Sequence, residues 1–71
     1  MEVTTQQAEK ICKSNQGFNQ LGFTMLVTRL RRLYTENPTP ATALTCAAEI
    51  NKFLEKYHSI MSKDFEIITK L

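Results

Sequence analysis

The stretch Asn37-Pro38-Thr39-Pro40 separates two apolar segments with helical patterning and decides how this chain folds. Proline disfavours helical geometry in the residue before it, so we expect a helix to end near Glu36. Pro40 suits the first position of a new helix, and Thr39 suits its N-cap, where the hydroxyl accepts a hydrogen bond from a backbone amide. One helix that ends and another that begins within so short a stretch predict an αα-hairpin.

The segment after the turn carries a broad apolar stripe at heptad positions a, d and e, which Asp64 interrupts. This periodicity predicts an amphipathic helix over about 40–70. A continuous helix from Pro40 to Leu71 would be about 48 Å long. Leu44, Ala48 and Phe65 are apolar but fall outside the stripe. The stripe consists of Ala43, Cys46, Ala47, Ile50, Phe53, Leu54, Tyr57, Ile60, Met61, Ile67, Ile68 and Leu71.

The segment before the turn predicts a first helix over about 5–36 that is broken near Gly17. Thr4 and Gln7 have the spacing of a capping box, which marks a helix start. Gly17 is expected in the left-handed conformation that often follows a helix end. The break leaves a short N-terminal helix and a longer one leading to the turn. The pairing of the hairpin is expected to place Phe23 against Phe53.

The chain has 71 residues, of which 42% are hydrophobic and 23% charged, so we expect a single helical domain over 1–71. A domain of this size builds a small core and is usually supported by a partner, a metal or disulfides. One neighbouring helix would cover only about half of the stripe, and exposed apolar surface of that extent is typical of interaction sites. We therefore expect the all-α hairpin to complete a four-helix bundle, either as a homodimer or by docking on a partner protein.

Cys12 and Cys46 lack the spacing of a zinc site or a redox motif. The expected hairpin pairing places them about half its length apart, which argues against an intrachain disulfide. Buried, reduced cysteines are typical of cytoplasmic proteins, and a cytoplasmic location is the expectation. The most apolar window, Leu21 to Leu33, is too short to span a bilayer. The first residues lack the pattern of a signal peptide.

No combination of nucleophile, base and orienting group is evident, so we expect neither enzymatic activity nor a cofactor or metal site. His58, the only histidine, falls on the polar face of the second helix. Asp64 is the one charge on the stripe. It could act as a general acid or base, but a structural pair with Lys10 or Lys13 of the opposing helix is the favoured interpretation.

The most informative feature of the charge pattern is a cluster of arginines. Arg29, Arg31 and Arg32 are all the arginines of the chain, whose net charge is +2. Such a cluster could contact phosphate groups or an acidic partner protein. Helical angles predict that Arg31 points away from the apolar side and that Arg29 and Arg32 flank it. The mild net charge makes a nucleic-acid-binding regulator the alternative hypothesis, behind a non-enzymatic protein–protein interaction or regulatory module.

Two helices joined by an Asn-Pro turn resemble the subunits of type III secretion needles, which would imply a subunit of a larger assembly. The size is also similar to that of helical-hairpin phosphatases that act on response regulators. The stretch Ala47-Ala48-Glu49-Ile50-Asn51 keeps only the glutamate of their Ser-Gln-Glu-Leu-Asp signature. No site residue is carried over from either family.

Overall fold

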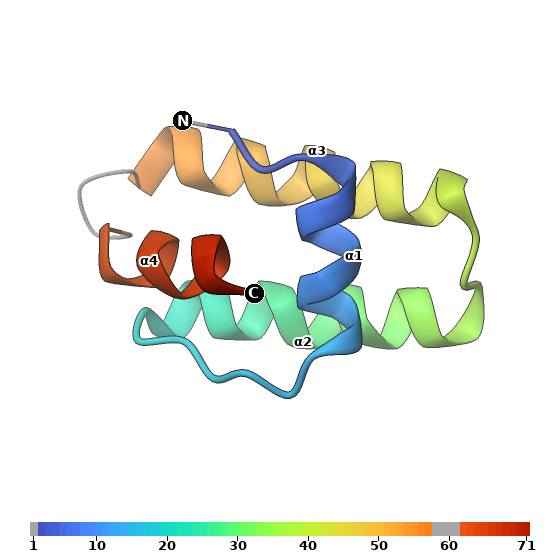
Figure 1. Ribbon diagram of the computed structural model, residues 1–71, viewed down its shortest axis with the longest axis horizontal. Coiled ribbons are helices and arrows are strands. Elements are labelled where there is room, and N and C mark those ends of the chain that lie inside the picture. Colours follow the sequence, from blue (N-terminus) through green and yellow to red (C-terminus); the bar gives the residue numbers. More distant parts are fainter. Residues whose placement is uncertain (1, 58–61) are drawn as a thin grey trace.

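A computed structural model describes residues 2–57 and 62–71, and over these residues the chain is helical without strands. It contains α1 (Thr5–Lys13), α2 (Leu21–Glu36), α3 (Pro40–Tyr57) and α4 (Ser62–Lys70), as Figure 1 shows. The all-α prediction is confirmed.

Helices α2 and α3 form the predicted hairpin and lie side by side in opposite directions (Figure 1). The end of α2 and the start of α3 fall at the predicted residues. Thr39 caps α3, since its hydroxyl accepts a hydrogen bond from the backbone N–H of Thr42 at 3.2 Å. The rings of Phe23 and Phe53 meet across the hairpin with centroids 5.6 Å apart, which confirms the expected pairing.

The first helical segment is broken between Lys13 and Leu21, as expected. The capping box at the start of α1 is present, with hydrogen bonds of 3.1 and 2.9 Å exchanged between Thr4 and Gln7. The prediction for Gly17 is wrong, because this glycine does not have a positive φ. Instead, α1 ends as the backbone turns extended at Ser14.

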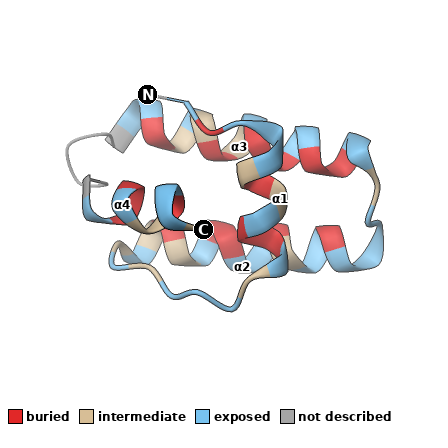
Figure 2. Cartoon of the chain, in the orientation of Figure 1, coloured by how far each residue is buried: buried red, intermediate tan, exposed pale blue. Residues whose placement is uncertain are grey.

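Helix α1 crosses from α3 to α2 and fills the space between them (Figure 1). The segment just before α1 is fixed to α3, because the Asn51 side chain accepts a hydrogen bond from Val3 N–H at 2.6 Å and donates one to Val3 C=O at 2.9 Å. Figure 2 shows that the buried residues line the inner sides of the helices around α1. Asn51 lies outside the apolar stripe of the sequence, so the sequence pattern did not predict this contact.

A single helix over about 40–70 is wrong, because α3 and α4 are separate helices. The longest dimension of the molecule is 31 Å, well below the length of such a helix. Helix α4 runs in the opposite direction to α3 and contacts α1 (Figure 1).

Asp64, in the first turn of α4, is only 1% exposed. Its carboxylate accepts hydrogen bonds from the loop before α2. Its Oδ1 accepts from the backbone N–H of Asn19 at 2.7 Å and from Nδ2 of the same residue at 3.1 Å. Its Oδ2 accepts from the backbone N–H of Gln20 at 3.0 Å. The expected pair with Lys10 or Lys13 is therefore wrong. A structural role for Asp64 fits this geometry.

The described residues of the apolar stripe lie mostly in the core of the single chain, because α1 packs on α3 beside α2 and α4, which carries Ile68, packs on α1. Among the described residues, the expectation that about half of the stripe stays exposed in a single chain is therefore wrong. Completion of a bundle by a homodimer or a partner protein stays a prediction. Phe65, which lies outside the stripe in the heptad count, is buried too. The side chain of Tyr57 and residues His58, Ile60 and Met61 lie outside the described part of the structure. The buried stripe residues are Ala43, Cys46, Ala47, Ile50, Leu54 and Ile68, and Phe53, Ile67 and Leu71 are partly buried.

The first prediction tests this core on one helix. Ile50→Ala should lower the free energy of unfolding by about 2–5 kcal/mol, because it leaves a cavity at a fully buried position. Leu44→Ala is the matched control, since Leu44 is 62% exposed on the same helix and should change stability by less than about 0.5 kcal/mol. Urea unfolding followed by circular dichroism measures both. Equal losses would show that the burial pattern of α3 is wrong.

The second prediction concerns the buried carboxylate. Asp64→Ala should lower the free energy of unfolding by about 1.5–3 kcal/mol, because the hydrogen bonds that Asn19 and Gln20 donate to a charged acceptor are lost. Glu66→Ala, an exposed acidic residue of the same helix, is the control and should have little effect. Thermal melts of the two variants make the comparison. A parent-like melt of Asp64→Ala would contradict the structural role.

Candidate partner-binding groove

Arg31 is part of the fold rather than an exposed cation. Its Nε donates to the carbonyl oxygen of Ile11 at 3.1 Å, and a terminal guanidinium nitrogen donates to the carbonyl oxygen of Gln16 at 2.9 Å. These bonds satisfy carbonyls at and after the end of α1, where a cation also complements the helix dipole. Burial lowers the pKa of Arg31 from its usual value, yet a guanidinium stays protonated at neutral pH. The prediction that Arg31 points to solvent is wrong.

Arg29 and Arg32 remain exposed on α2, as predicted. They are three residues apart and therefore lie on neighbouring turns of one helix face. The described residues offer neither of them a salt bridge. Only two members of the arginine cluster are thus placed to meet a partner.

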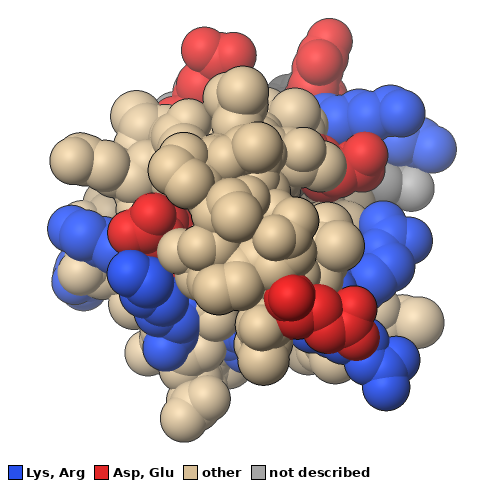
Figure 3. Space-filling model, turned by 90° about the vertical axis from the view of Figure 1, so that its right-hand side faces the viewer, with Lys and Arg blue, Asp and Glu red and all other residues tan. Residues whose placement is uncertain are grey.

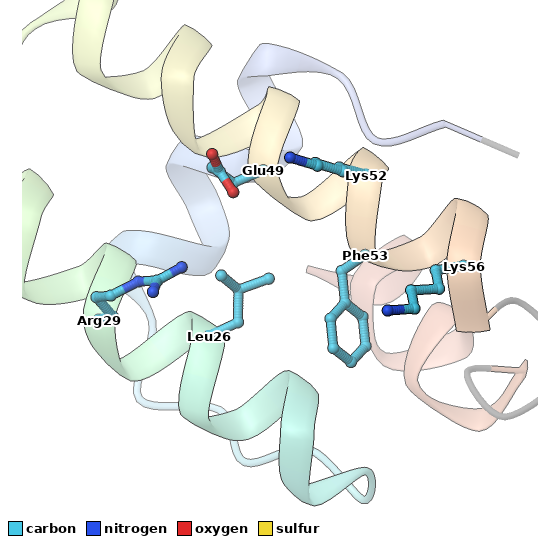
Figure 4. Close-up of a pocket in the computed structure, with 6 residues that line it drawn as sticks. All are labelled: Leu26, Arg29, Glu49, Lys52, Phe53 and Lys56. Carbon is cyan, nitrogen blue, oxygen red and sulfur yellow. The ribbon is translucent and has the colours of Figure 1, made fainter.

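A groove of about 300 Å³ opens between α2 and α3 next to Arg29. Figure 4 shows Leu26 and Arg29 on α2 facing side chains from α3 across it. Leu26 and Phe53 form its apolar floor, and the charged side chains stand around them. We call this surface the α2–α3 groove. It is lined by Leu26, Arg29, Glu49, Lys52, Phe53 and Lys56.

The groove continues along α2 in both directions. Toward the start of the helix, an adjoining hollow of about 470 Å³ adds Gly22 and Met25. A further hollow of about 420 Å³ runs over the outer side of α2 past Met25 to Arg32. Met25 is 65% exposed, and Leu21, one turn before it, is 74% exposed. Large apolar side chains therefore stand in solvent beside the groove.

Gly22 lets the groove come close to the helix backbone. A Cβ atom at this position would stand 3.4 Å from the Phe53 ring and 3.0 Å from Oε1 of Gln20. Gln20 Oε1 is the acceptor that caps α2 through the backbone N–H of Phe23 at 3.1 Å. The absence of a side chain at Gly22 thus keeps the Phe53 ring and the cap of α2 in place together.

The border of the groove is basic. Around its apolar floor and the continuation along α2 stand Arg29, Arg32, Lys52 and Lys56, against a single carboxylate, that of Glu49. On the end of the molecule that carries the α2–α3 turn, charged side chains stand at the margins and the centre is uncharged (Figure 3). The charged groups of this end therefore do not form a broad basic face.

Sequence reasoning found part of this site. Arg29, Arg32 and Phe53 were singled out, but Met25, Leu26 and Lys52 were missed as groove residues. Of the described stripe residues, Phe53 lines the groove, and most of the others are buried in the core. The sequence did contain a signal for the groove. Leu21 and Met25 are apolar and one helical turn apart, on a face of α2 that α3 alone does not cover.

Cys12 and Cys46 lie together in the core, contrary to the expected separation. The Sγ atoms of both residues are 4.0 Å from the carbonyl oxygen of Leu30. The expected separation of the two cysteines was wrong because α1 crosses the α2–α3 hairpin instead of continuing the line of α2. Burial, together with the neighbouring Cys46 thiol, raises the pKa of Cys12 to about 12.

Among the described residues, three or more metal-ligating side chains do not come together at any point. Within the same residues, no helix combines the length and apolarity needed to cross a membrane.

Comparisons with models of protein families, with curated proteins and with solved structures give no significant match to this chain. The site is therefore interpreted from its own geometry and charge.

The third prediction separates the three arginines. Arg31→Gln should lower the free energy of unfolding by about 1 kcal/mol, because a charged donor to two carbonyls is lost at a partly exposed position. Arg29→Gln and Arg32→Gln are matched controls that should stay within about 0.5 kcal/mol of the parent. Guanidinium unfolding of the three variants gives the ranking. Equal effects at all three positions would contradict the structural assignment of Arg31.

Proposed function

We propose that this protein is a non-enzymatic interaction module whose α2–α3 groove binds a short, acidic, amphipathic helix of a partner protein. The observation that carries the proposal is the exposure of apolar side chains, Met25 above all, beside a floor of Leu26 and Phe53 with a basic border. Exposed apolar surface of this kind costs solvation free energy, and binding of an apolar partner surface removes that cost.

The shape of the groove favours a helix as the occupant. From Gly22 to Arg29 the groove follows α2 for eight residues, a rise of about 10 Å along the helix axis. Two helical turns of a partner match this length, with apolar residues at i, i+3 or i+4, and i+7 on one face. Met25 supports such contacts, because a flexible thioether side chain adapts to different apolar shapes.

The charges around the groove favour an acidic partner. Arg29 and Lys52 stand on opposite sides of the apolar floor, one on each helix (Figure 4). Carboxylates on both flanks of a partner helix would meet them, and such rim contacts mainly provide specificity and faster association. Nucleic acid is a weaker candidate, because Arg31 is committed to the fold and only Arg29 and Arg32 of the cluster remain exposed.

The fourth prediction uses a display library of short helical peptides selected on the full chain. The enriched peptides should combine one apolar face with flanking Asp or Glu. Their affinity for the double variant Arg29→Glu/Lys52→Glu should fall by about tenfold or more, which corresponds to about 1.4 kcal/mol. Met25→Ser should also weaken binding, with the helical circular dichroism signal unchanged. Fluorescence anisotropy measures each affinity.

The matched control is Lys70→Glu, which makes the same charge change on α4, away from the groove, and should leave peptide affinity unchanged. Enrichment of neutral or basic peptides would contradict the proposal. So would salt-sensitive binding of a single-stranded oligonucleotide that is lost in the double variant, because that result favours nucleic acid. Self-association through the groove, abolished by Met25→Ser in sedimentation experiments, would instead identify a second copy as the occupant.

A further inference from the structure

A pair of thiols in the core stands apart from the α2–α3 groove. Cys12 comes from α1 and Cys46 from α3, and both side chains are buried. Their sulfur atoms contact the same carbonyl oxygen, that of Leu30 on α2, at 4.0 Å each. The Cys46 thiol is also a neighbour that raises the pKa of Cys12. Three helices thus bring two nucleophilic atoms to one point.

The backbones around this point approach closely because the neighbouring core positions carry small side chains. Ala8, one turn before Cys12, is fully buried, and so is Ala43, one turn before Cys46. Ala47 follows on α3 and is also buried. Small residues at such positions allow helices to pack at short distance, which a disulfide between helices requires.

We propose that Cys12 and Cys46 form a redox-modification site, at which a small-molecule disulfide such as oxidised glutathione converts the two thiols into an intrachain disulfide. The proposal rests on the placement of the thiols and is independent of the groove.

The chemistry proceeds by two thiol–disulfide exchanges. The Cys12 thiolate attacks one sulfur of oxidised glutathione, forms a mixed disulfide and releases one glutathione thiolate, which takes up a proton. The Cys46 thiolate then attacks the Cys12 sulfur and releases the second glutathione. The protein loses two protons and two electrons, and oxidised glutathione is reduced to two thiols. Cys12 is the first nucleophile because it is 8% exposed, whereas Cys46 is fully buried.

The closed fold protects the thiols, so the reaction passes through a local opening of α1. A buried, protonated thiol is a poor nucleophile, and the raised pKa of Cys12 agrees with this protection. Two polar contacts hold α1 in place on either side of Cys12. One joins Val3 to Asn51, and the other joins the carbonyl oxygens of Ile11 and Gln16 to Arg31. Once formed, the disulfide links α1 covalently to α3 and suppresses this opening.

The test exposes the full, folded chain to a glutathione redox buffer and follows free thiols, intact mass and melting temperature. We expect a monomeric product that has lost two hydrogen atoms and both free thiols. Its melting temperature should rise by about 10 °C or more over the reduced chain, because a cross-link restricts the unfolded state. Cys46→Ser should stop at the mixed disulfide with one glutathione. Cys12→Ser should react several-fold more slowly than the parent.

A kinetic comparison checks the opening step with variants that keep both cysteines. Arg31→Gln should oxidise several-fold faster than the parent, since it loosens α1, and Arg32→Gln should oxidise at the parental rate. Equal rates for the two variants would overturn the opening step.

Three results would overturn the site itself. The folded chain could keep both thiols under conditions in which the urea-unfolded chain forms the disulfide. The disulfide could join two chains, as seen by a doubled mass that reductant reverses. The oxidised chain could melt below the reduced one, which would show that the thiol geometry does not accept the bond without strain.

Discussion

The buried carboxylate of Asp64 is the constraint on which the arrangement of the other parts depends. A charge that is withdrawn from water must be matched by hydrogen bonds, and here the loop before α2 provides them through Asn19 and Gln20. These donors lie at the start of α2, where the helix dipole also favours a negative charge. The requirement fixes α4 against the start of α2 and makes it part of the core.

The position of α4 decides which surface is available for function. Because α1 packs on α3 and α4 packs on α1, the described residues of the apolar stripe contribute largely to the core of the single chain. Part of the apolar surface that remains exposed lies around Met25, beside the α2–α3 groove. The apolar side chains that form the core and those that line the α2–α3 groove therefore lie on different faces of the same two helices.

The short helix α1 links the fold to its chemistry. It is held to α3 by Asn51 and to α2 by Arg31, and these contacts place Cys12 beside Cys46. A helix of nine residues contributes little stability by itself, so its order depends on such tertiary contacts. This dependence is why one arginine of the cluster serves the structure while its neighbours face solvent.

The sequence alone determined the helical class, the turn at Asn37-Pro38-Thr39-Pro40, the caps at Thr4 and Thr39, and the pairing of Phe23 with Phe53. These features depend on local rules, because proline geometry, capping hydroxyls and helical periodicity act within a few residues. In the candidate site, local patterning likewise found Arg29, Arg32 and Phe53.

Only the tertiary structure decided that α4 is separate from α3, that Arg31 binds the end of α1, and that the two cysteines meet. No glycine or proline marks the stretch between Tyr57 and Ser62, and the heptad pattern runs through it unchanged. The single sequence signal was Phe65, an apolar residue out of phase with the stripe, which the core nevertheless buries. The chain does not form the long helix, because separate helices bring Asp64 to its hydrogen-bond donors and close the core. The free energy gained in this way comes from contacts between residues far apart in the sequence.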